Sequence, residues 1–447
     1  MEWLLILQIV LFAIAGALIY IIIGIIPGTD ETSVLVPATV LLFAFNLDPL
    51  VVLSFFIGAM VSLNVTDSIP TALTSIPGGV MATPMIESSI FLKERGLVTH
   101  TIRKMTSGAI YGTFIGLLVG LGVIGGVKLI EALSGVRIEQ AINGYQQWVF
   151  LAGAIFLALM SKKKLISLLA IVPFGLTVYL ARLASNTISA TPFFLAITVG
   201  PLLFQLVTML IPRLRSESSV EGNKDIVIEK DKKFGRKEFA TSMNIKTNGR
   251  TIISSFISSF LFFLSPVGVT MLVGETATNR IKDKEEQALT KVSVMNGVAS
   301  ATYMSGILVS LFAFGFAISP AAAGPGGAFF NVDYQFLSRI QFGPAVAVII
   351  FAMLVALFIA ATLSFKYAGR ITYLVFKYIP QEAVISLLIG LAFLLVYLDS
   401  GFIGVLVISG VALVAGFLNR LGVGHGILFM SFYTALYLIS FGFLPLG

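Results

Sequence analysis

The sequence predicts an all-α polytopic membrane protein with about 10–14 membrane segments, arranged as two inverted repeats with broken or re-entrant helices. Three observations lead to this prediction. Hydrophobic residues fill 57% of the 447 positions and charged residues only 11%, whereas a soluble domain carries about 25% charged residues. Long apolar runs recur along the chain, and polar residues gather where proline and glycine interrupt them.

The apolar runs give the expected elements, because a helix needs about 20 apolar residues to cross the hydrocarbon core. The candidate spans are 3–26, 106–127, 145–160, 165–183, 192–211, 251–264, 292–318, 342–363, 383–398, 402–418 and 426–446. Three shorter runs, 33–45, 49–63 and 69–80, are too brief or too interrupted to be simple spans. The first run has neither a basic region before it nor a cleavage site after it, so we expect a retained helix.

A charged segment at 213–250 divides the chain almost in the middle. Such segments usually join two membrane halves. We therefore expect a first membrane repeat at 1–212, a charged cytoplasmic linker at 213–250 and a second membrane repeat at 251–447.

Each half contains two interruptions at similar intervals, which suggests an internal repeat. In the first half these are Pro27-Gly28 and Pro77-Gly78-Gly79. In the second half they are Pro266 with Gly268, and Pro320 with the glycine-rich segment 324–327.

The distribution of basic residues predicts opposite orientations for the two halves, since cytoplasmic loops are enriched in Lys and Arg. The residues expected in the cytoplasm are Lys93, Arg95, Arg103, Lys104, Lys162–Lys164, those of the linker, Arg280, Lys282, Lys284, Lys366, Arg370 and Arg420. The alternating loops 128–143, 185–191 and 399–400 carry little net positive charge. Opposite orientation is the arrangement of inverted-repeat secondary transporters.

Polar residues at the breaks are the candidates for a solute site. Backbone groups freed by Pro-Gly within a bilayer persist only inside protein or beside a watery cavity, where they can bind ions. The candidate substrate-binding residues are Pro27, Gly28, Thr29, Asn64, Thr66, Thr74, Ser75, Pro77, Gly78 and Asn296. A single Pro-Gly pair is more often a simple kink, but two breaks in each half with polar neighbours favour a site.

Three carboxylates are candidates for ion coupling, because an ionisable residue inside a membrane is costly unless it has a function. Asp67 is the first choice, and Asp30 and Glu275 are the others. Asp30 and Glu31 could equally lie in an interfacial turn that caps the helix beginning near Thr32.

Enzyme and metal chemistry are not expected. The chain has no cysteine and no HExxH, nucleophile-elbow or P-loop sequence. The formal net charge of +7 is accounted for by basic cytoplasmic loops, so no nucleic-acid partner is expected. We expect neither a cofactor nor a metal, with sodium or a proton as the coupling ion.

At its breaks the chain resembles the large permease subunit of tripartite tricarboxylate transporters, the TctA-type family. The residues that carry the resemblance are Gly24–Gly28, Val36-Pro37, Leu47–Pro49, Gly58–Met60, Asn64–Ser75, Pro77–Gly79, Leu92–Gly96, Asn279–Gln287, Asn296-Gly297 and Gly324–Gly326. The chain departs from the family pattern at Asp30–Thr32, where the family usually has a glycine-rich segment, and at Leu63–Val65.

The resemblance implies a permease for carboxylates that is driven by an ion gradient. It also implies a small four-helix membrane subunit and an extracytoplasmic solute-binding protein as partners. The substrate-site positions that the resemblance implies are Pro27, Gly28, Thr29, Asn64, Thr74, Pro77 and Gly78, with Asn296 opposite them.

The leading hypothesis is therefore a secondary transporter for small organic anions, di- or tricarboxylates. We expect it to be a multi-pass protein of the cell membrane of a prokaryote. Membrane lipid and a second copy of the chain are further possible partners. Two other classes stay open. One is a transporter that flips a polyprenyl phosphate or a similar anionic lipid, with Lys93 and Arg95 near the head group. The other is a membrane scaffold whose polar runs lie in exposed loops.

Overall fold

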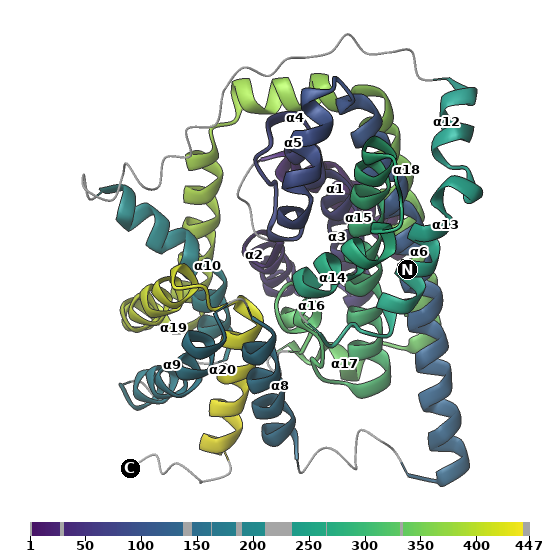
Figure 1. The fold of residues 1–447 in the computed structure, drawn as a ribbon. Helices are drawn as coiled ribbons and strands as arrows, with labels where there is room; N and C mark the ends of the chain where they lie inside the picture. The colour runs from purple at the N-terminus through teal and green to yellow at the C-terminus, as the bar shows by residue number, and fades with distance from the viewer. Residues whose placement is uncertain are drawn as a thin grey trace.

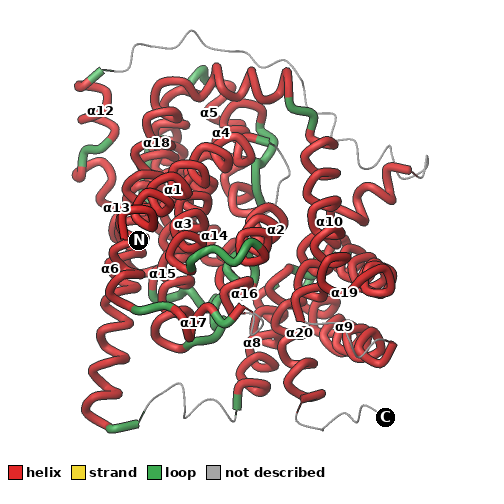
Figure 2. The backbone as a smooth tube through the Cα atoms, turned by 180° about the vertical axis from the view of Figure 1, so that it is seen from behind, coloured by secondary structure: helices red, strands yellow, loops and turns green. Residues whose placement is uncertain are grey.

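The computed structural model describes residues 2–26, 31–136, 145–161, 163–184, 190–210, 235–264, 266–330 and 334–440. Within these ranges the chain is helical, with turns and loops between the helices and no strand (Figure 2). The all-α prediction is confirmed. The Pro27-Gly28 break and most of the linker, 213–234, lie outside the described residues.

The first half contains α1 (Glu2–Ile25), α2 (Glu31–Ala44), α3 (Pro49–Thr66), α4 (Ser68–Thr74), η1 (Val80–Met85), α5 (Ile86–Glu94), α6 (Val98–Ser134), α8 (Gln146–Met160), α9 (Lys164–Ala184) and α10 (Ala190–Leu210). The second contains α12 (Arg236–Ser242), α13 (Ile245–Ser259), α14 (Pro266–Thr278), α15 (Lys284–Val309), η2 (Ser310–Phe314), α16 (Pro320–Ala323), η3 (Gly327–Phe330), α17 (Phe336–Arg339), α18 (Phe342–Tyr378), α19 (Gln381–Arg420) and α20 (His425–Ser440). The described end of the predicted linker, 235–250, is thus largely helical.

Eight helical stretches among the described residues are long and apolar enough to cross a membrane: Trp3–Ile25, Pro49–Thr74, Val98–Ser134, Lys164–Ala184, Thr191–Thr208, Lys284–Phe314, Phe342–Tyr378 and Ala383–Arg420. Two shorter apolar helices are Glu31–Ala44 and Trp148–Leu159. The expectation that 49–63 and 69–80 are too short for a span needs revision. The two runs join through Asp67, whose backbone stays helical at φ −62° and ψ −24°. The polar residues between them therefore interrupt the helix only locally.

Two of the candidate spans form the centre of the molecule. In Pro49–Thr74 and in Lys284–Phe314, 89% of the most apolar window is buried inside the protein, against 28% for Trp3–Ile25. Both central spans end in irregular backbone: Ser75 has a φ of 64° after α4, and Gly315 has a φ of 72° after η2. Each half therefore contains one central span that ends in a left-handed backbone conformation.

The helices form two groups, which Figure 1 separates clearly. Helices α1, α3–α6 and α12–α18 make the larger group, and α8, α9, α10, α19 and α20 make the smaller one. Helix α2 packs against α3 of the larger group and against α10 and α19 of the smaller, and α16 packs against α15 and α20.

Within the larger group each half packs on the other in a reciprocal way. Helix α3 packs against α1 and α18, and α1 also contacts α18. Correspondingly, α15 packs against α13 and α6, and α13 also contacts α6. Helices α6 and α18 are both 37 residues long. Each half therefore contributes one long helix to the other half's bundle.

A stripe of glycines on α6 makes its closest contact possible. A Cβ on Gly108 or Gly112 would overlap the backbone oxygen of Ser293 or Gly297 on α15. Gly116 lies equally close to Ala301. Small residues at every fourth position allow helix backbones to approach closely in a membrane, where van der Waals packing holds helices together. Among the described helices this is the most extensive single contact between the two halves, and α10 with α19 and α3 with α18 are others.

Helix α19 contains a sharp interruption. Gly401 has a φ of 66° and a ψ of −166°, which lies outside the helical region and is open to glycine only. It falls between the predicted spans 383–398 and 402–418, so the sequence located this boundary correctly.

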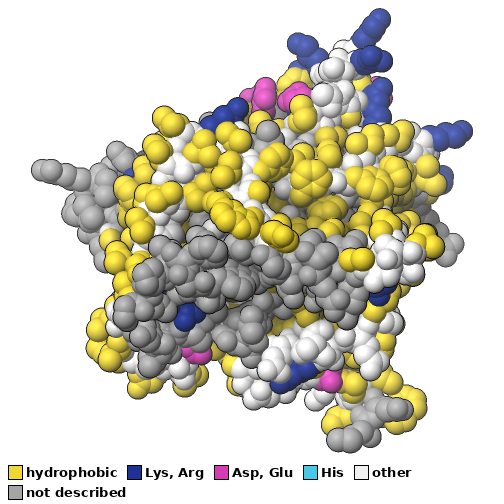
Figure 3. Space-filling view, turned by 90° about the horizontal axis from the view of Figure 1, so that it is seen from below, with side chains coloured by type: hydrophobic (Ala, Val, Ile, Leu, Met, Phe, Trp, Pro, Cys, Tyr) yellow, Lys and Arg dark blue, Asp and Glu magenta, His cyan; other side chains and the backbone are white. Residues whose placement is uncertain are grey.

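The outer surface of the described residues is apolar, as contact with lipid requires. Exposed fractions reach 84% at Trp3, 75% at Phe358 and 70% at Leu398. The space-filling view in Figure 3 shows hydrophobic side chains over much of one face, with fewer Lys and Arg side chains, most of them toward its periphery.

Candidate substrate and ion site

The candidate site lies where the central helix of the first half is interrupted. Helix α3 ends at Thr66 and α4 begins at Ser68, so that Asp67 is the junction. The chain then turns at Ser75 and returns through Pro77 and Gly78. The Gly78 N–H donates a hydrogen bond of 3.2 Å to the Asp67 backbone oxygen. The loop is thereby folded back against the junction.

Two glycines allow this close packing. A Cβ on Gly78 would overlap the Asp67 backbone oxygen and crowd the Gly24 oxygen. A Cβ on Gly24, near the end of α1, would overlap the Thr66 hydroxyl. The end of α1, the α3–α4 junction and the Pro77-Gly78 loop therefore meet at one place.

Asn296 brings the second half to the same place. It lies in the middle of α15 and is 2% exposed. Its side-chain amide donates to the Ser68 hydroxyl at 3.2 Å and to the Met105 backbone oxygen on α6 at 2.9 Å. The sequence prediction that Asn296 stands opposite the first-half break agrees with this geometry. One amide links the central helices of both halves with α6.

The Asp67 carboxyl group is enclosed by protein. The residue is 3% exposed, and its Oδ1 atom has no hydrogen-bond partner among the described residues. No Lys, Arg or His of the described residues forms an ion pair with it. A buried carboxylate without an ionic partner is strongly disfavoured, so a proton or a bound cation would stabilise this position.

Buried hydroxyl groups lie near Asp67 along the chain, and another lies on α6 beside a residue that Asn296 contacts. Thr71, one turn after Asp67, and Thr106, next to the Met105 that binds Asn296, both have buried hydroxyls without a described partner. Thr66 donates to the Ser62 backbone oxygen at 2.9 Å. Oxygen atoms without partners next to a carboxylate are the ligands that hard cations take in proteins. The cluster is suited to a cation or a proton.

The other predicted binding residues extend along the same element. Asn64 lies one turn before Asp67 and is 7% exposed. The Thr74 hydroxyl donates to the Pro70 backbone oxygen at 2.8 Å and accepts from the Ile76 N–H at 3.3 Å, which shapes the turn at Ser75. Thr74, Ser75 and Pro77 are partly exposed. The structure thus brings Thr66, Asp67, Gly78 and Asn296 together and places Asn64, Thr74, Ser75 and Pro77 next to them along the chain.

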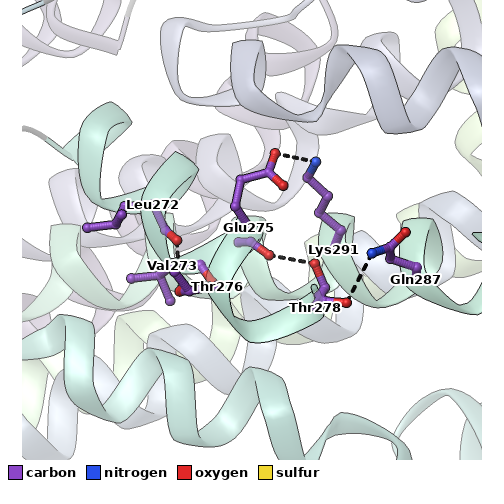
Figure 4. A network of polar contacts seen from close by, with 8 residues as sticks. Leu272, Val273, Glu275, Thr276, Thr278, Gln287 and Lys291 are labelled. Carbon is purple, nitrogen blue, oxygen red and sulfur yellow. Dashed lines mark hydrogen bonds and ion pairs between the residues drawn. The ribbon is translucent and has the colours of Figure 1, made fainter. Parts of the chain in front are cut away.

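Glu275 does not join this cluster. It lies on α14, its side chain is 60% exposed, and it forms an ion pair with Lys291 of α15. Figure 4 shows this pair beside the Thr278 backbone oxygen, which accepts from the Gln287 side chain at 3.1 Å. The pair fastens α14 to the first part of α15. Pro27, Gly28, Thr29 and Asp30 lie outside the described residues.

Ser68, Thr71 and Thr106 were absent from the candidates drawn from the sequence. Ser68 and Thr71 carry a signal, since they belong to the polar run that starts at Asn64. Thr106 carries none, because a lone threonine in an apolar run more often bonds to its own helix. Only the packing of α6 against α15 identifies it.

The comparisons with known proteins place the chain in a family. A family model described as Tripartite tricarboxylate transporter TctA family matches residues 10–428. The match covers both halves and every residue of the candidate site. Neither a curated protein nor a solved structure matched the chain.

Proposed function

The chain belongs to the tripartite tricarboxylate transporter TctA family, and from this premise we propose that it is the permease that moves small di- or tricarboxylates across a membrane, driven by a sodium or proton gradient. A tricarboxylate transporter component is a membrane transport protein, not an enzyme. The residues that would perform transport are those of the α3–α4 junction and Asn296.

One observation carries the proposal: a buried carboxyl group without an ionic partner lies at the break of a central helix, where a residue of the other half meets it. Asp67 and Asn296 belong to different halves, and Ser68 links them. Binding of a cation or proton at Asp67 would change the hydrogen bonding of Ser68 and Asn296. It would thereby alter how the two halves hold each other, which is the coupling that alternating access requires.

The substrate would be recognised by amides and hydroxyls, since no basic side chain of the described residues pairs with this junction. Asn64 offers an amide donor, and the partly exposed loop at Thr74–Pro77 offers hydroxyl and backbone groups. A cation beside Asp67 would supply the positive charge that the site's own side chains lack. The carboxylate and the coupling ion would therefore bind together.

The wider arrangement is also a proposal. The reciprocal contacts of α1, α3 and α18 with those of α13, α15 and α6 support two repeats. Family membership supports a small membrane subunit and an extracytoplasmic solute-binding protein as partners, and a location in the cell membrane of a prokaryote.

Uptake of labelled citrate into liposomes tests the proposal. The chain, reconstituted with its two partner subunits, should accumulate citrate when a sodium or proton gradient is applied. Asn296→Ala should reduce uptake at least tenfold, because the amide bonds to Ser68 and Met105 are lost. Gln287→Ala, which removes an amide bond on the exposed end of the same helix, is the control. Transbilayer movement of a polyprenyl phosphate without citrate uptake would overturn the proposal in favour of lipid transport.

A further inference from the structure

A groove lies outside the candidate site, between the long helices of the two halves. It has a volume of about 610 Å³ and runs between α6 and α18, with α12 along its third side. Its size falls in the range of about 300–1,000 Å³ that is usual for small-molecule sites. No residue of α3 or α4 lines the groove itself, so the proposed transport site does not account for it.

The walls of the groove are apolar over most of its length. Helix α18 contributes Leu354, Phe358 and Ala361, and α6 contributes Ile110 and Phe114. Leu354 is 47% exposed and Phe358 is 75% exposed. Because α6 and α18 are candidate membrane spans, this side of the groove faces lipid and suits a hydrocarbon chain.

Helix α12 keeps the groove open on the third side. The Tyr111 hydroxyl of α6 donates to the Met243 backbone oxygen at 2.6 Å, directly after α12. The Phe239 ring of α12 meets the Phe365 ring of α18 edge-on, with 6.0 Å between the ring centres. These two contacts hold α12 across α6 and α18, where it lines the groove.

One end of the groove is basic and polar. Lys366 lines the groove and also lines a neighbouring cavity of about 30 Å³, together with Arg103 and Ser364. Ser364 is 3% exposed, and its hydroxyl has no hydrogen-bond partner among the described residues. A cavity of this size admits a group no larger than a water molecule or a phosphate oxygen. Arg103 also interacts with the Glu238 carboxylate of α12. Lys366 adds a second positive charge, so the two cationic side chains and the hydroxyl donor together suit a phosphate group.

We propose that this groove binds one anionic phospholipid of the surrounding membrane, with its phosphate at Arg103, Ser364 and Lys366 and an acyl chain along α6 and α18. Basic pockets between membrane helices bind anionic head groups in this way. The lipid would lie between the long helices of the two halves and would stabilise their contact.

Lipid binding to the purified full-length chain tests this proposal directly. Phosphatidylglycerol or phosphatidylcholine is added to the protein in mild detergent, and bound lipid is counted by native mass spectrometry. We expect phosphatidylglycerol to bind with the higher affinity and to raise the melting temperature. Lys366→Gln should weaken its binding about fivefold, the contribution of one basic residue near an anionic lipid. Lys377→Gln, on the exposed end of the same helix, should leave binding unchanged.

A second variant tests the apolar part. Ala361→Trp fills the groove and should abolish binding of both lipids. Equal affinity for the two lipids, or unchanged phosphatidylglycerol binding in Lys366→Gln, would overturn the proposal. The comparison of the two lipids uses wild-type protein, and Lys366→Gln is a surface variant. These two measurements therefore decide whether the lipid binds even if Ala361→Trp does not fold. Neither depends on transport activity.

Discussion

At the scale of single residues, Asp67 is the first choice of the sequence prediction, and the structure describes its surroundings. A carboxylate inside an apolar run indicates function, because burying it is costly. The structure adds what the sequence could not contain: the side chain is enclosed, without an ionic partner, and one residue away from Ser68, which Asn296 contacts from the other half. The family resemblance implies that Asn296 stands opposite, but only folding determines which oxygen it binds.

Asp67→Asn should uncouple transport without unfolding the protein. The amide keeps the size and most of the hydrogen-bonding capacity of the carboxyl group, while it can neither lose a proton nor balance a cation. Gradient-driven citrate uptake should fall at least tenfold, with an unchanged melting temperature. The matched control is Glu275→Gln, which neutralises a 60% exposed carboxylate and should leave uptake intact. Full gradient-driven uptake by Asp67→Asn would remove Asp67 from the mechanism.

Ser75 allows backbone strain to be separated from substrate contact. Its φ of 64° is left-handed, a conformation that costs a residue other than glycine about 1–2 kcal/mol. Ser75→Gly should therefore keep the protein at least as stable, while Ser75→Val should destabilise it. Thermal unfolding in detergent measures both. If the hydroxyl also contacts the substrate, Ser75→Gly will raise the KM for citrate although the fold is preserved. A lower melting temperature in Ser75→Gly than in Ser75→Val would contradict the strain argument.

At the scale of elements, the positions of the helices were largely predictable and their pairing was not. Apolar runs locate helices because the bilayer sets a minimum length. The same composition does not distinguish a helix that faces lipid from one that faces protein, since both are apolar. Pro49–Thr74 looked too interrupted for a span, yet it is one of the two most buried spans. A signal for pairing was present in the four-residue spacing of Gly108, Gly112 and Gly116, but it does not name the partner helix.

Gly112→Ala tests the α6–α15 contact. The new methyl group would overlap the Gly297 backbone oxygen, which no rotamer change can relieve. Overpacking of this kind costs about 1–3 kcal/mol, so the melting temperature should fall. Gly122→Ala on the same helix is the control, because a Cβ there meets no atom within 4 Å. That change should be neutral or stabilising, since alanine is the better helix former by about 1 kcal/mol. Equal effects of the two changes would show that α6 and α15 are not packed this closely.

Glu238 gives α12 a dependence on pH. Hydrogen bonds from its own backbone N–H and from the Gly235 N–H, at 2.8 Å, lower the pKa of the Glu238 carboxyl group, and Arg103 lowers it further. A lowered pKa means that the charged form stabilises this contact above the ordinary value near 4.5 and that the stabilisation is lost as the pH falls through the lowered pKa.

The fluorescence of a Phe239→Trp variant reports this contact, because residue 239 packs against Phe365. On acidification its emission should change in a single step below pH 4.5. Adding Glu238→Gln should remove the step and give the acid spectrum at neutral pH. A step of the same size in both proteins would assign it to another group.

At the scale of the whole molecule, the two halves are not separate domains, although the linker at 213–250 divides the sequence. Helix α6 of the first half belongs to the bundle of α13 and α15, and α18 of the second half belongs to that of α1 and α3. Composition and periodicity are local properties, so they could reveal two halves but not this exchange of α6 and α18 between the two bundles.

Residues 1–212 and 235–447 expressed together as two chains should therefore copurify, and neither should give a monodisperse, cooperatively unfolding protein alone. A stable, monodisperse single half would contradict the exchange.

The same exchange brings loops from both halves to one side of the membrane. Arg95, at the end of α5, forms an ion pair of 3.2 Å with Glu285 at the start of α15, and the distribution of basic residues predicts that both loops are cytoplasmic. Because the chain has no cysteine, a single chain that carries both Arg95→Cys and Glu285→Cys should form a disulfide under mild oxidation.

The side of the membrane is tested by single substitutions. Arg95→Cys or Glu285→Cys alone should react with a membrane-impermeant maleimide only in inverted vesicles. Lys128→Cys, from a loop predicted outside, should react only in intact cells. Labelling of the two single-cysteine variants from opposite sides would rule out the ion pair, and labelling of both from outside would reverse the predicted orientation while keeping the fold.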